Sequence, residues 1–356
     1  MSPSPAASPD GLIGQYNRNA KRTILLIAVS AVGVLIAGLV FSVLGATDTA
    51  FGDVIESIRN FFSGAPLDAK QKVILYLRLP RIAMAVFAGV GLSVSGCAMQ
   101  GITHNPLVSP FTIGISNAAA FGASMAIVFG FGIAAHSDLG VVLTAFLLAF
   151  LCAAAVYGVS LHVGMSAESI VLTGIAVNYF FSAATSVIEY FADEHRLAAA
   201  VAWAFGSFNG AEWREVAVVS ALVSACFIAL LSMAPSLNAL SSGNDEVARS
   251  IGVNPARVRV LVGVCSVLAT AAVISFTGVI GFVGLAGPHI ARMLIGADHR
   301  YLIPFSAVTG AALTLAADTI GRLILAPVLI PVGIVVSFLG VPIFVNLILA
   351  KRKGAF

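Results

Sequence analysis

The sequence predicts an all-α integral membrane protein with about ten membrane-spanning helices. Of its 356 residues, 59% are hydrophobic and only 10% are charged, and the mean hydropathy is +1.01. No single soluble core of this length requires so apolar a composition. Between Arg81 and Asp138 the sequence contains no Asp, Glu, Lys or Arg. As one helix this stretch would be roughly 84 Å long, against a hydrocarbon core of roughly 30 Å, so the chain must cross the bilayer several times.

The N-terminal region contains a polar segment and then the first candidate span. Residues 1–22 are polar and rich in proline and serine, whereas the run from Thr23 to Leu44 is uncharged. This run is too long for the apolar region of a signal peptide and ends in no small-residue cleavage pattern, so we expect a retained first span. We therefore expect a cytoplasmic tail at 1–22, a transmembrane domain at 23–350 and a basic cytoplasmic tail at 351–356.

Charges and proline or glycine breaks divide the apolar sequence into ten spans. They are expected near 23–44, 82–103, 112–133, 139–163, 168–190, 215–236, 260–276, 279–296, 302–324 and 330–350. An even number of spans leaves both termini on one side. If that side is the cytoplasm, 11 of the 19 basic residues lie inside, including the Lys21-Arg22 pair and the C-terminal Lys351-Arg352-Lys353. The positive-inside rule therefore favours cytoplasmic termini.

Two apolar segments contain breaks that a regular hairpin of spans does not need. Asn105-Pro106 and Ser109-Pro110 interrupt the long uncharged stretch. Non-helical backbone at that depth is tolerated only where protein or a water-filled cavity satisfies it. A second break has glycine at every third position, which forms a ridge that another helix can approach closely: Gly278, Gly281, Gly284 and Gly287. Close packing and a place in a pathway both remain open for this ridge.

Residues 242–259 form a charged, helix-forming segment that does not belong in lipid. Gly252 and Pro255 divide it, so we expect two short helices in the cytoplasm. Asp245 and Glu246 near the first helix start, and Arg249 later, suit the helix dipole, which favours an ordered element. An ordered element outside the bilayer can dock into a cleft on another protein and transmit a rigid-body motion.

The sequence offers no catalytic or metal-binding constellation. It contains no phosphate loop, no nucleophile elbow, no His-Glu-x-x-His pair and no carboxylate cluster with metal-ligand spacing. Its four cysteines lie singly within apolar runs: Cys97, Cys152, Cys226 and Cys265. We therefore expect a protein that is not an enzyme and that binds no metal or cofactor itself.

A series of motifs in order along the chain carries a family resemblance. They are Arg78-Leu-Pro-Arg81, Ser95-Gly-x-x-x-Gln100, Asn105-Pro-Leu-x-x-Pro110, Gly114-Ile-Ser116, Glu246-Val-Ala-Arg-Ser-Ile-Gly-Val253, Gly281-Phe-Val-Gly-Leu285, Gly287-Pro-His-Ile-x-Arg292, Ala316-Ala-Asp-x-x-x-Arg322, Pro331-Val-Gly-Ile334 and Gly340-Val-Pro-x-Phe344. Through them the sequence resembles, from about Leu77 to Leu349, the FecCD family of permeases. These permeases serve type II ABC importers for iron–siderophore complexes, haem and vitamin B12.

The resemblance implies a permease fold of the type II ABC importers, in the cytoplasmic (inner) membrane, with cytoplasmic coupling helices. It implies a second permease copy or a close paralogue, with a pathway along the dimer axis. It also implies two ATPase subunits, which would bind ATP and Mg, and a periplasmic or lipid-anchored substrate-binding protein. Membrane lipid is the remaining partner, and no nucleic acid is expected.

The resemblance also assigns candidate site residues. The 242–259 segment matches the coupling helices, and its candidate residues are Asp245, Glu246, Arg249, Ser250, Gly252 and Arg257. The positions that face the binding protein in the family match Arg78, Arg81 and Arg322. For these arginines the alternative is snorkelling to lipid head groups. Asp318 is costly in lipid, so we also expect it to face protein and to pair with Arg322 one turn later.

Two further sites follow from the resemblance. The turn between the fourth and fifth spans matches the cytoplasmic gate, with Ser166, Ala167 and Glu168. Glu168 departs from the small hydroxyl residues of the vitamin B12 permease, and it could equally serve the start of the fifth span. The aromatic candidates for the translocation pathway are Tyr179, Phe180, Tyr190 and Phe191. An interfacial aromatic belt is the alternative for these rings.

The predicted function is the permease of an ATP-driven importer that carries an iron(III)–siderophore complex inward. Haem, cobalamin (vitamin B12) and molybdate are alternative cargoes within similar permeases, and many aromatic and apolar residues favour a bulky chelate. An ion-coupled secondary transporter is an alternative of another class. It would usually need several carboxylates at the membrane midplane and would not need the 242–259 segment.

Overall fold

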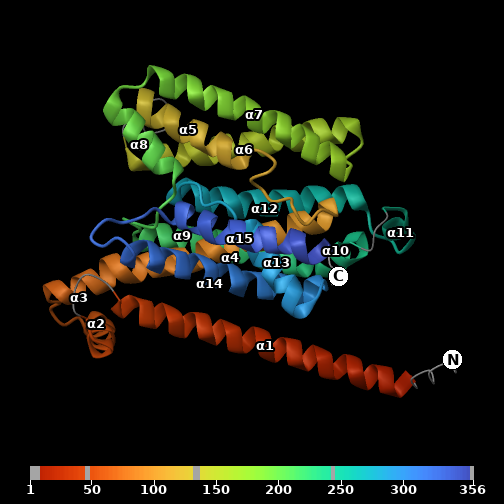
Figure 1. The fold of residues 1–356 in the computed structure, drawn as a ribbon, viewed down its shortest axis with the longest axis horizontal. Coiled ribbons are helices and arrows are strands. Elements are labelled where there is room, and N and C mark those ends of the chain that lie inside the picture. The colour runs from red at the N-terminus through yellow and green to blue at the C-terminus, as the bar shows by residue number, and fades with distance from the viewer. Residues whose placement is uncertain (1–8, 45–48, 131–136, 242–244, 353–356) are drawn as a thin grey trace.

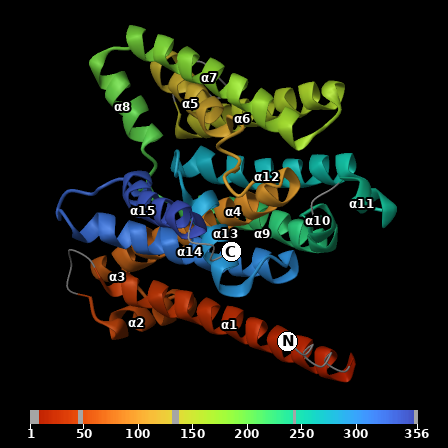
Figure 2. The same ribbon diagram turned by 45° about the vertical axis from the view of Figure 1, so that its right-hand side comes forward.

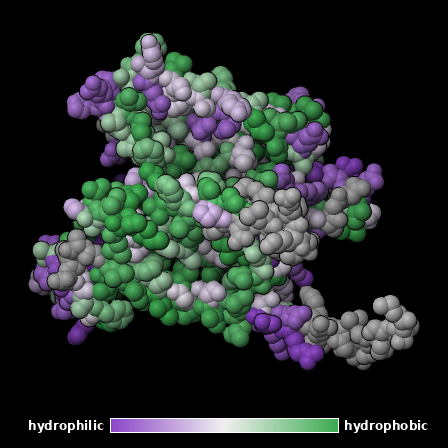
Figure 3. All heavy atoms as spheres, viewed as in Figure 1, coloured by the Kyte–Doolittle hydropathy of each residue, from purple (hydrophilic) through white to green (hydrophobic). Residues whose placement is uncertain are grey.

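The computed structural model describes residues 9–44, 49–130, 137–241 and 245–352, and every regular element in these ranges is helical (Figure 1). In the view of Figure 3, hydrophobic side chains cover the middle of the molecule and hydrophilic side chains gather toward its two ends. This distribution is that of helices embedded in a hydrocarbon layer with polar ends in water.

A central group of helices surrounds α4 (Leu79–Thr103). α4 packs against α14 (His299–Leu323), α12 (Pro255–Thr277), α13 (Val283–Ile295) and α9 (Trp213–Ser232). Most side chains of α4 are buried by these neighbours, including uncharged polar ones such as Ser93, Ser95 and Gln100. We call this central group of helices the frame.

A second group lies along one side of the frame. It contains α5 (Ile115–Phe129), α6 (Asp138–Val163), α7 (Ala167–Phe191) and the short α8 (Glu194–Ala204). α5 and α6 pack against each other and against α12, while α7 packs on the outer side of α5 and α6 and makes fewer contacts with α4 (Figures 1 and 2). Much of the surface of α7 is therefore left uncovered.

The remaining helices lie at the periphery. α1 (Pro9–Val43) runs along α14, and α15 (Val332–Arg352) packs on α13 and α14. At one end of the bundle lie α2 (Phe51–Ser63), α3 (Ala69–Val73), a π-helical turn at Ile74–Arg78 that leads into α4, and α8. At the opposite end lie α10 (Ala234–Ser241) and α11 (Asp245–Ser250) (Figure 1). We call these the α2 end and the α11 end.

The ten predicted spans all correspond to helices. Among the described residues, seven helices are long and apolar enough to cross a membrane, and three shorter apolar helices complete the set: Ile115–Phe129, Val283–Ile295 and Val332–Pro342. The break after α4 is also confirmed. Residues 104–114 are not helical, and the buried backbone there is satisfied locally, because Thr112 Oγ1 accepts from the Ser109 amide at 3.1 Å.

The prediction of two short helices within 242–259 is wrong. Only α11 is a separate helix in the described part of this segment, and residues 242–244 lie outside the described residues. Asn254 caps the next helix by accepting from the Arg257 amide at 3.1 Å, and Pro255 occupies its first position. Proline there starts a helix without ending it, so the helix continues as α12 to Thr277.

The glycine ridge after α12 is confirmed as a packing device, and two of its members, Gly284 and Gly287, lie at the contact with α4. A Cβ atom on Gly96 of α4 would lie 1.8 Å from the carbonyl oxygen of Gly284 on α13, and one on Gly287 would lie 2.2 Å from the Ser93 hydroxyl. Gly281 has open space around it. Small residues at these positions therefore let the backbones of α4 and α13 touch.

Candidate functional site

One face of α7 carries hydroxyl groups along its uncovered surface. Tyr179 is 73% exposed and Tyr190 is 83% exposed, and Ser182 and Ser186 lie exposed between them. Because residues three or four apart share a helix face, these four side chains form one stripe, which we call the hydroxyl stripe. Polar groups in a membrane-length helix are better matched by water or a polar partner than by acyl chains.

The neighbouring face of α7 is apolar. It carries Phe180, Val187 and Phe191, all of which are exposed. Both predicted pairs of pathway aromatics therefore reach the surface, but the tyrosines and the phenylalanines lie on different faces. The phenylalanine face suits lipid or another apolar helix, whereas the tyrosine face suits a wet passage.

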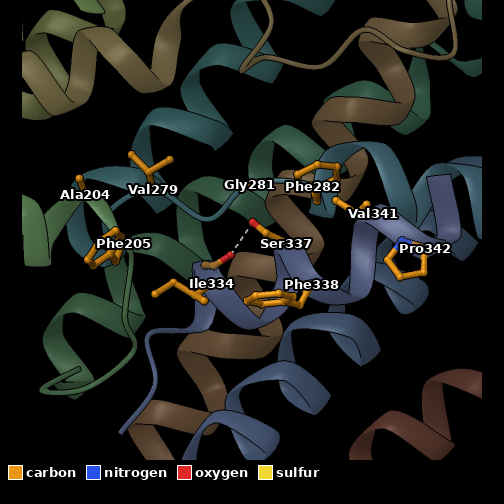
Figure 4. Close-up of a pocket in the computed structure, with 11 residues that line it drawn as sticks. Ala204, Phe205, Val279, Gly281, Phe282, Ile334, Ser337, Phe338, Val341 and Pro342 are labelled. Atoms are coloured by element: carbon orange, nitrogen blue, oxygen red, sulfur yellow. Dashed lines mark hydrogen bonds between the residues drawn. The ribbon is translucent and has the colours of Figure 1, made fainter. Parts of the chain in front are cut away.

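A pocket of about 600 Å³ opens beside α15, and Figure 4 shows its wall. The wall is formed by the end of α8, the segment before α13 and one side of α15. Its residues are Ala204, Phe205, Val279, Gly281, Phe282, Gly333, Ile334, Ser337, Phe338, Val341 and Pro342. The Ser337 hydroxyl donates to the Gly333 carbonyl at 2.7 Å, so it is engaged within α15. The pocket is thus a concave, mostly apolar and aromatic surface.

The helix α11 presents Glu246 and Arg249 outward. Its only buried side chain is Ala248, whose carbonyl accepts from the Val253 amide at 2.9 Å where the chain reverses toward α12. The exposed residues of α11 and of the chain that follows it as far as Arg257 include all but one of the predicted coupling residues: Glu246, Arg249, Ser250, Gly252 and Arg257. Exposed Val247 and Ile251 add an apolar patch among these charges. Such a mixed surface on a projecting helix suits docking into another protein.

Asp245, the remaining coupling candidate, binds a buried arginine. Its two carboxylate oxygens accept from Arg259 Nη1 and Nη2, each at 2.7 Å. The Arg259 side chain is 4% exposed and also donates from Nε to the Ile102 carbonyl at 3.2 Å and from Nη1 to the Met165 carbonyl at 3.2 Å. The Arg259 hydrogen bonds hold the pKa of Asp245 below its ordinary value of 3.8.

The predicted gate turn is one of the segments that Arg259 contacts. Met165 is buried with φ +51°, a left-handed conformation that is uncommon outside glycine, and its amide donates to the Ser160 carbonyl at 2.6 Å. Ser166 caps α7 by accepting from the Ser169 amide at 3.0 Å. Ala167 is half-buried and Glu168 is exposed in the first turn of α7. A gate role for Ser166, Ala167 and Glu168 stays a prediction.

The three predicted docking arginines lie together at the α2 end, and all three are engaged within the chain. Arg81 donates from Nε and Nη2 to Asp318, with distances of 2.9 to 3.1 Å, and Asp318 is 1% exposed. Arg322 Nε lies 3.3 Å from the other side of that carboxylate. Arg78 Nη1 donates to the Ser42 carbonyl at 2.8 Å.

The expected Asp318–Arg322 pair is therefore present, but Arg81 is the closer partner. All three arginines also line a pocket of about 400 Å³ that opens at this end. A role in docking another protein stays a prediction for Arg78, Arg81 and Arg322.

Sequence reasoning missed Arg259 as a site residue. The available signal was its position, directly before a long uncharged apolar run, where a buried charge needs partners. The identity of those partners depends on the α6–α7 turn and the end of α4, which are distant in sequence.

Comparison with known proteins gives consistent matches. The model of the FecCD transport family matches residues 26–350. The hemin transport system permease protein HmuU of Yersinia pestis is 37% identical over 325 residues, which cover 90% of this chain and 96% of HmuU. The iron(3+)-hydroxamate import system permease protein FhuB of Bacillus subtilis is 35% identical over 93% of this chain and 84% of FhuB.

Two further matches extend the range of substrates and add a solved structure. The molybdate import system permease protein MolB of Haemophilus influenzae is 36% identical over 80% of this chain and 83% of MolB. A solved structure, provisionally described as a metal-chelate type ABC transporter in an inward-facing conformation, matches with a TM-score of 0.79 and 32% identity. It covers 91% of this chain and 98% of that chain.

Proposed function

Since the chain belongs to the FecCD transport family, we propose that it is the membrane permease of an ATP-binding cassette importer for metal chelates, with an iron(III)–siderophore complex as cargo. ATP hydrolysis is supplied by separate ATPase subunits. The chain binds no cofactor itself and acts by changing which side of the membrane its pathway faces.

The observation that carries this proposal is the uncovered hydroxyl stripe of α7. A helix of membrane length that exposes Tyr179, Ser182, Ser186 and Tyr190 has a surface suited to a polar cargo in a wet passage. Rings and hydroxyls together can contact a bulky chelate that has both apolar and polar parts. The pathway is proposed to run between this stripe and the same stripe of a second permease copy.

The two ends of the molecule have separate proposed roles. The exposed charges and apolar patch of α11 dock into an ATPase subunit, so the α11 end and both termini face the cytoplasm, as the basic residues near the termini favour. The cluster of Arg78, Arg81 and Arg322 at the α2 end faces the substrate-binding protein. Charge complementarity there would guide docking of the carboxylate-bearing lobes of that protein.

Haem is the second candidate cargo. It is supported by the 37% identity to the hemin permease of Yersinia pestis over 90% of this chain. The mostly apolar pocket beside α15, which contains Phe205, Phe282 and Phe338, is also compatible with a flat aromatic macrocycle. Cobalamin and molybdate remain outcomes of the test.

The test is uptake into liposomes that contain the permease with its ATPase and its binding protein. A ferric hydroxamate, a ferric citrate complex, haem, cobalamin and molybdate are supplied in parallel, with ATP or with a non-hydrolysable analogue. We expect ATP-dependent uptake of a ferric chelate and little uptake of the others. Preferred uptake of another cargo would replace the substrate, and uptake driven by an ion gradient without ATP would overturn the proposal.

A further inference from the structure

Arg259 connects segments that are distant from one another in sequence. Its guanidinium donates to Asp245 in α11, to the Ile102 carbonyl in the last turn of α4 and to the Met165 carbonyl in the α6–α7 turn. Three of its nitrogen atoms take part, and the side chain is 4% exposed. One side chain therefore fixes the docking helix, the frame and the α6–α7 turn relative to each other.

The chemistry of this contact depends on the shape of the arginine side chain. A guanidinium presents a planar fork of donors that can bind a carboxylate with two hydrogen bonds and still reach carbonyl groups at its edges. A lysine ammonium would keep the charge but could not make the same set of contacts in the same plane. The position thus uses the geometry of the side chain as well as its charge.

The two ends of the contact differ in how firmly they are held. Asp245 belongs to a helix of six residues that projects from the bundle and has one buried side chain, Ala248. Met165 is buried and has a left-handed backbone conformation, and it lies in the turn between α6 and α7. Arg259 Nη1 donates both to Asp245 and to the Met165 carbonyl, so it is a direct polar connection between α11 and the α6–α7 turn.

We propose that Arg259 is the positioning residue that transmits displacement of α11 to the α6–α7 turn and so links ATP hydrolysis to movement of α7. The proposal rests on the proposed function, in which α11 docks into an ATPase subunit. In one arrangement Arg259 holds both Asp245 and the Met165 carbonyl. Displacement of α11 draws the guanidinium away from Met165, and the turn is released to take another conformation.

The test compares Arg259→Lys with Arg300→Lys in the complete transporter complex. Arg300 also lies near the α11 end and binds Asp298 with two nitrogen atoms, but this pair is half-exposed and joins residues two positions apart. ATP hydrolysis and uptake of a ferric hydroxamate are measured in the same liposomes. We expect Arg259→Lys to keep the rate of ATP hydrolysis within about 2-fold of the unaltered complex and to lower the uptake per ATP about 10-fold. A factor of this size is typical of coupling between two sites. Arg300→Lys should leave the ratio unchanged.

The ratio separates transmission from folding, because a merely structural defect lowers the amount of intact complex and leaves uptake per ATP as it was. An unchanged ratio in Arg259→Lys would overturn the proposal. If that variant does not assemble, Asp245→Asn decides the question, since it keeps the shape of the side chain and should lower the ratio in the same direction. If the unaltered complex hydrolyses ATP without importing any of the five cargoes, it is the proposed function that has failed.

Discussion

The helical stretch at 69–103, which contains α4, and the helix α7 are both apolar and long enough to cross a membrane, but they have opposite surroundings. In the most apolar part of the first, 78% of residues are buried inside the chain, whereas in α7 the figure is 11%. α4 touches neighbouring helices through glycines and carries an arginine near its start that binds a buried aspartate. α7 instead presents tyrosines, serines and phenylalanines outward. Apolar composition thus identifies a span without telling what the span faces.

The frame around α4 is therefore the part of the molecule that keeps one structure, whereas the uncovered surface of α7 is the part that can contact other molecules. The frame around α4 has buried ion pairs and backbone contacts, both of which tolerate little change. The uncovered surface of α7 has few internal contacts to lose. We therefore expect substitutions in the frame to affect stability and substitutions on α7 to affect transport.

The largest effect is expected from Asp318→Ala. The change leaves Arg81 and Arg322 buried without their carboxylate, and breaking a buried pair in this way costs about 3–5 kcal/mol. Thermal unfolding of the purified chain in detergent measures it. Asp193→Ala, which removes an exposed ion pair and the cap at the start of α8, is the control and should cost much less. Equal losses in the two variants would contradict a fixed frame.

A smaller loss is expected where α4 touches α13. Gly96→Ala places a methyl group 1.8 Å from the Gly284 carbonyl oxygen, so the two helices must separate, at a cost of about 1–3 kcal/mol. Gly158→Ala on α6 is the matched control, because nothing lies within 4 Å of the added atom. The free energy of unfolding of that control should rise by up to about 1 kcal/mol, because alanine has the higher helix propensity. Thermal unfolding in detergent again measures the difference. If both changes stabilise the protein, α4 and α13 are not in the close contact described above.

On α7 the comparison can be sharpened by testing its two faces against each other. Removing two hydroxyls with Tyr179→Phe and Tyr190→Phe should lower the uptake of a ferric hydroxamate about 3- to 10-fold. This corresponds to about one net hydrogen bond. Phe180→Leu with Phe191→Leu keeps an apolar face and should leave uptake per assembled complex unchanged. Both pairs should leave the unfolding temperature unaffected, and the opposite pattern of uptake would assign the pathway to the phenylalanine face.

The smallest effect is expected from a change of pH within the physiological range, which should leave the Asp245–Arg259 pair and the mobility of α11 unchanged. Because Arg259 holds the pKa of Asp245 below 3.8, the stabilisation from this pair is complete above that pH and is lost only as the pH falls through the lower folded value. A spin label at position 247, in a variant with Cys265→Ser, should report constant mobility from pH 8 to pH 5. Asp245→Asn should raise the mobility throughout, and a transition between pH 5 and pH 7 would contradict the assignment.

The sequence was sufficient for most of the fold. Long uncharged runs and proline or glycine breaks located all ten spans, because the bilayer requires continuous apolar helices of a narrow range of lengths. The boundary within 242–259 was misjudged, since Pro255 was read as a break although proline also begins helices. The short helices α2 and α3 are not predicted as separate elements, because amphipathic segments at the membrane surface lack such a length constraint.

The contacts of the candidate site are harder to predict from the sequence than the spans are. Asp318 was correctly expected to face protein, but the nearer partner, Arg81, lies 237 positions away along the chain. Periodicity within one helix can suggest a pair such as Asp318 and Arg322, whereas pairs between helices depend on packing. For the same reason Arg259 could be seen as a charge at the start of a span, but its contact with Met165 could not.

The hydroxyl stripe of α7 also bears on how the protein is made. A chain inserted by itself must hold Tyr179, Ser182, Ser186 and Tyr190 against lipid until something more polar covers them. In a newly synthesised copy that has not yet assembled, the uncovered hydroxyl stripe would therefore be a feature that membrane proteases can recognise. The cellular level of this chain would then follow the supply of its assembly partners more closely than its own rate of synthesis.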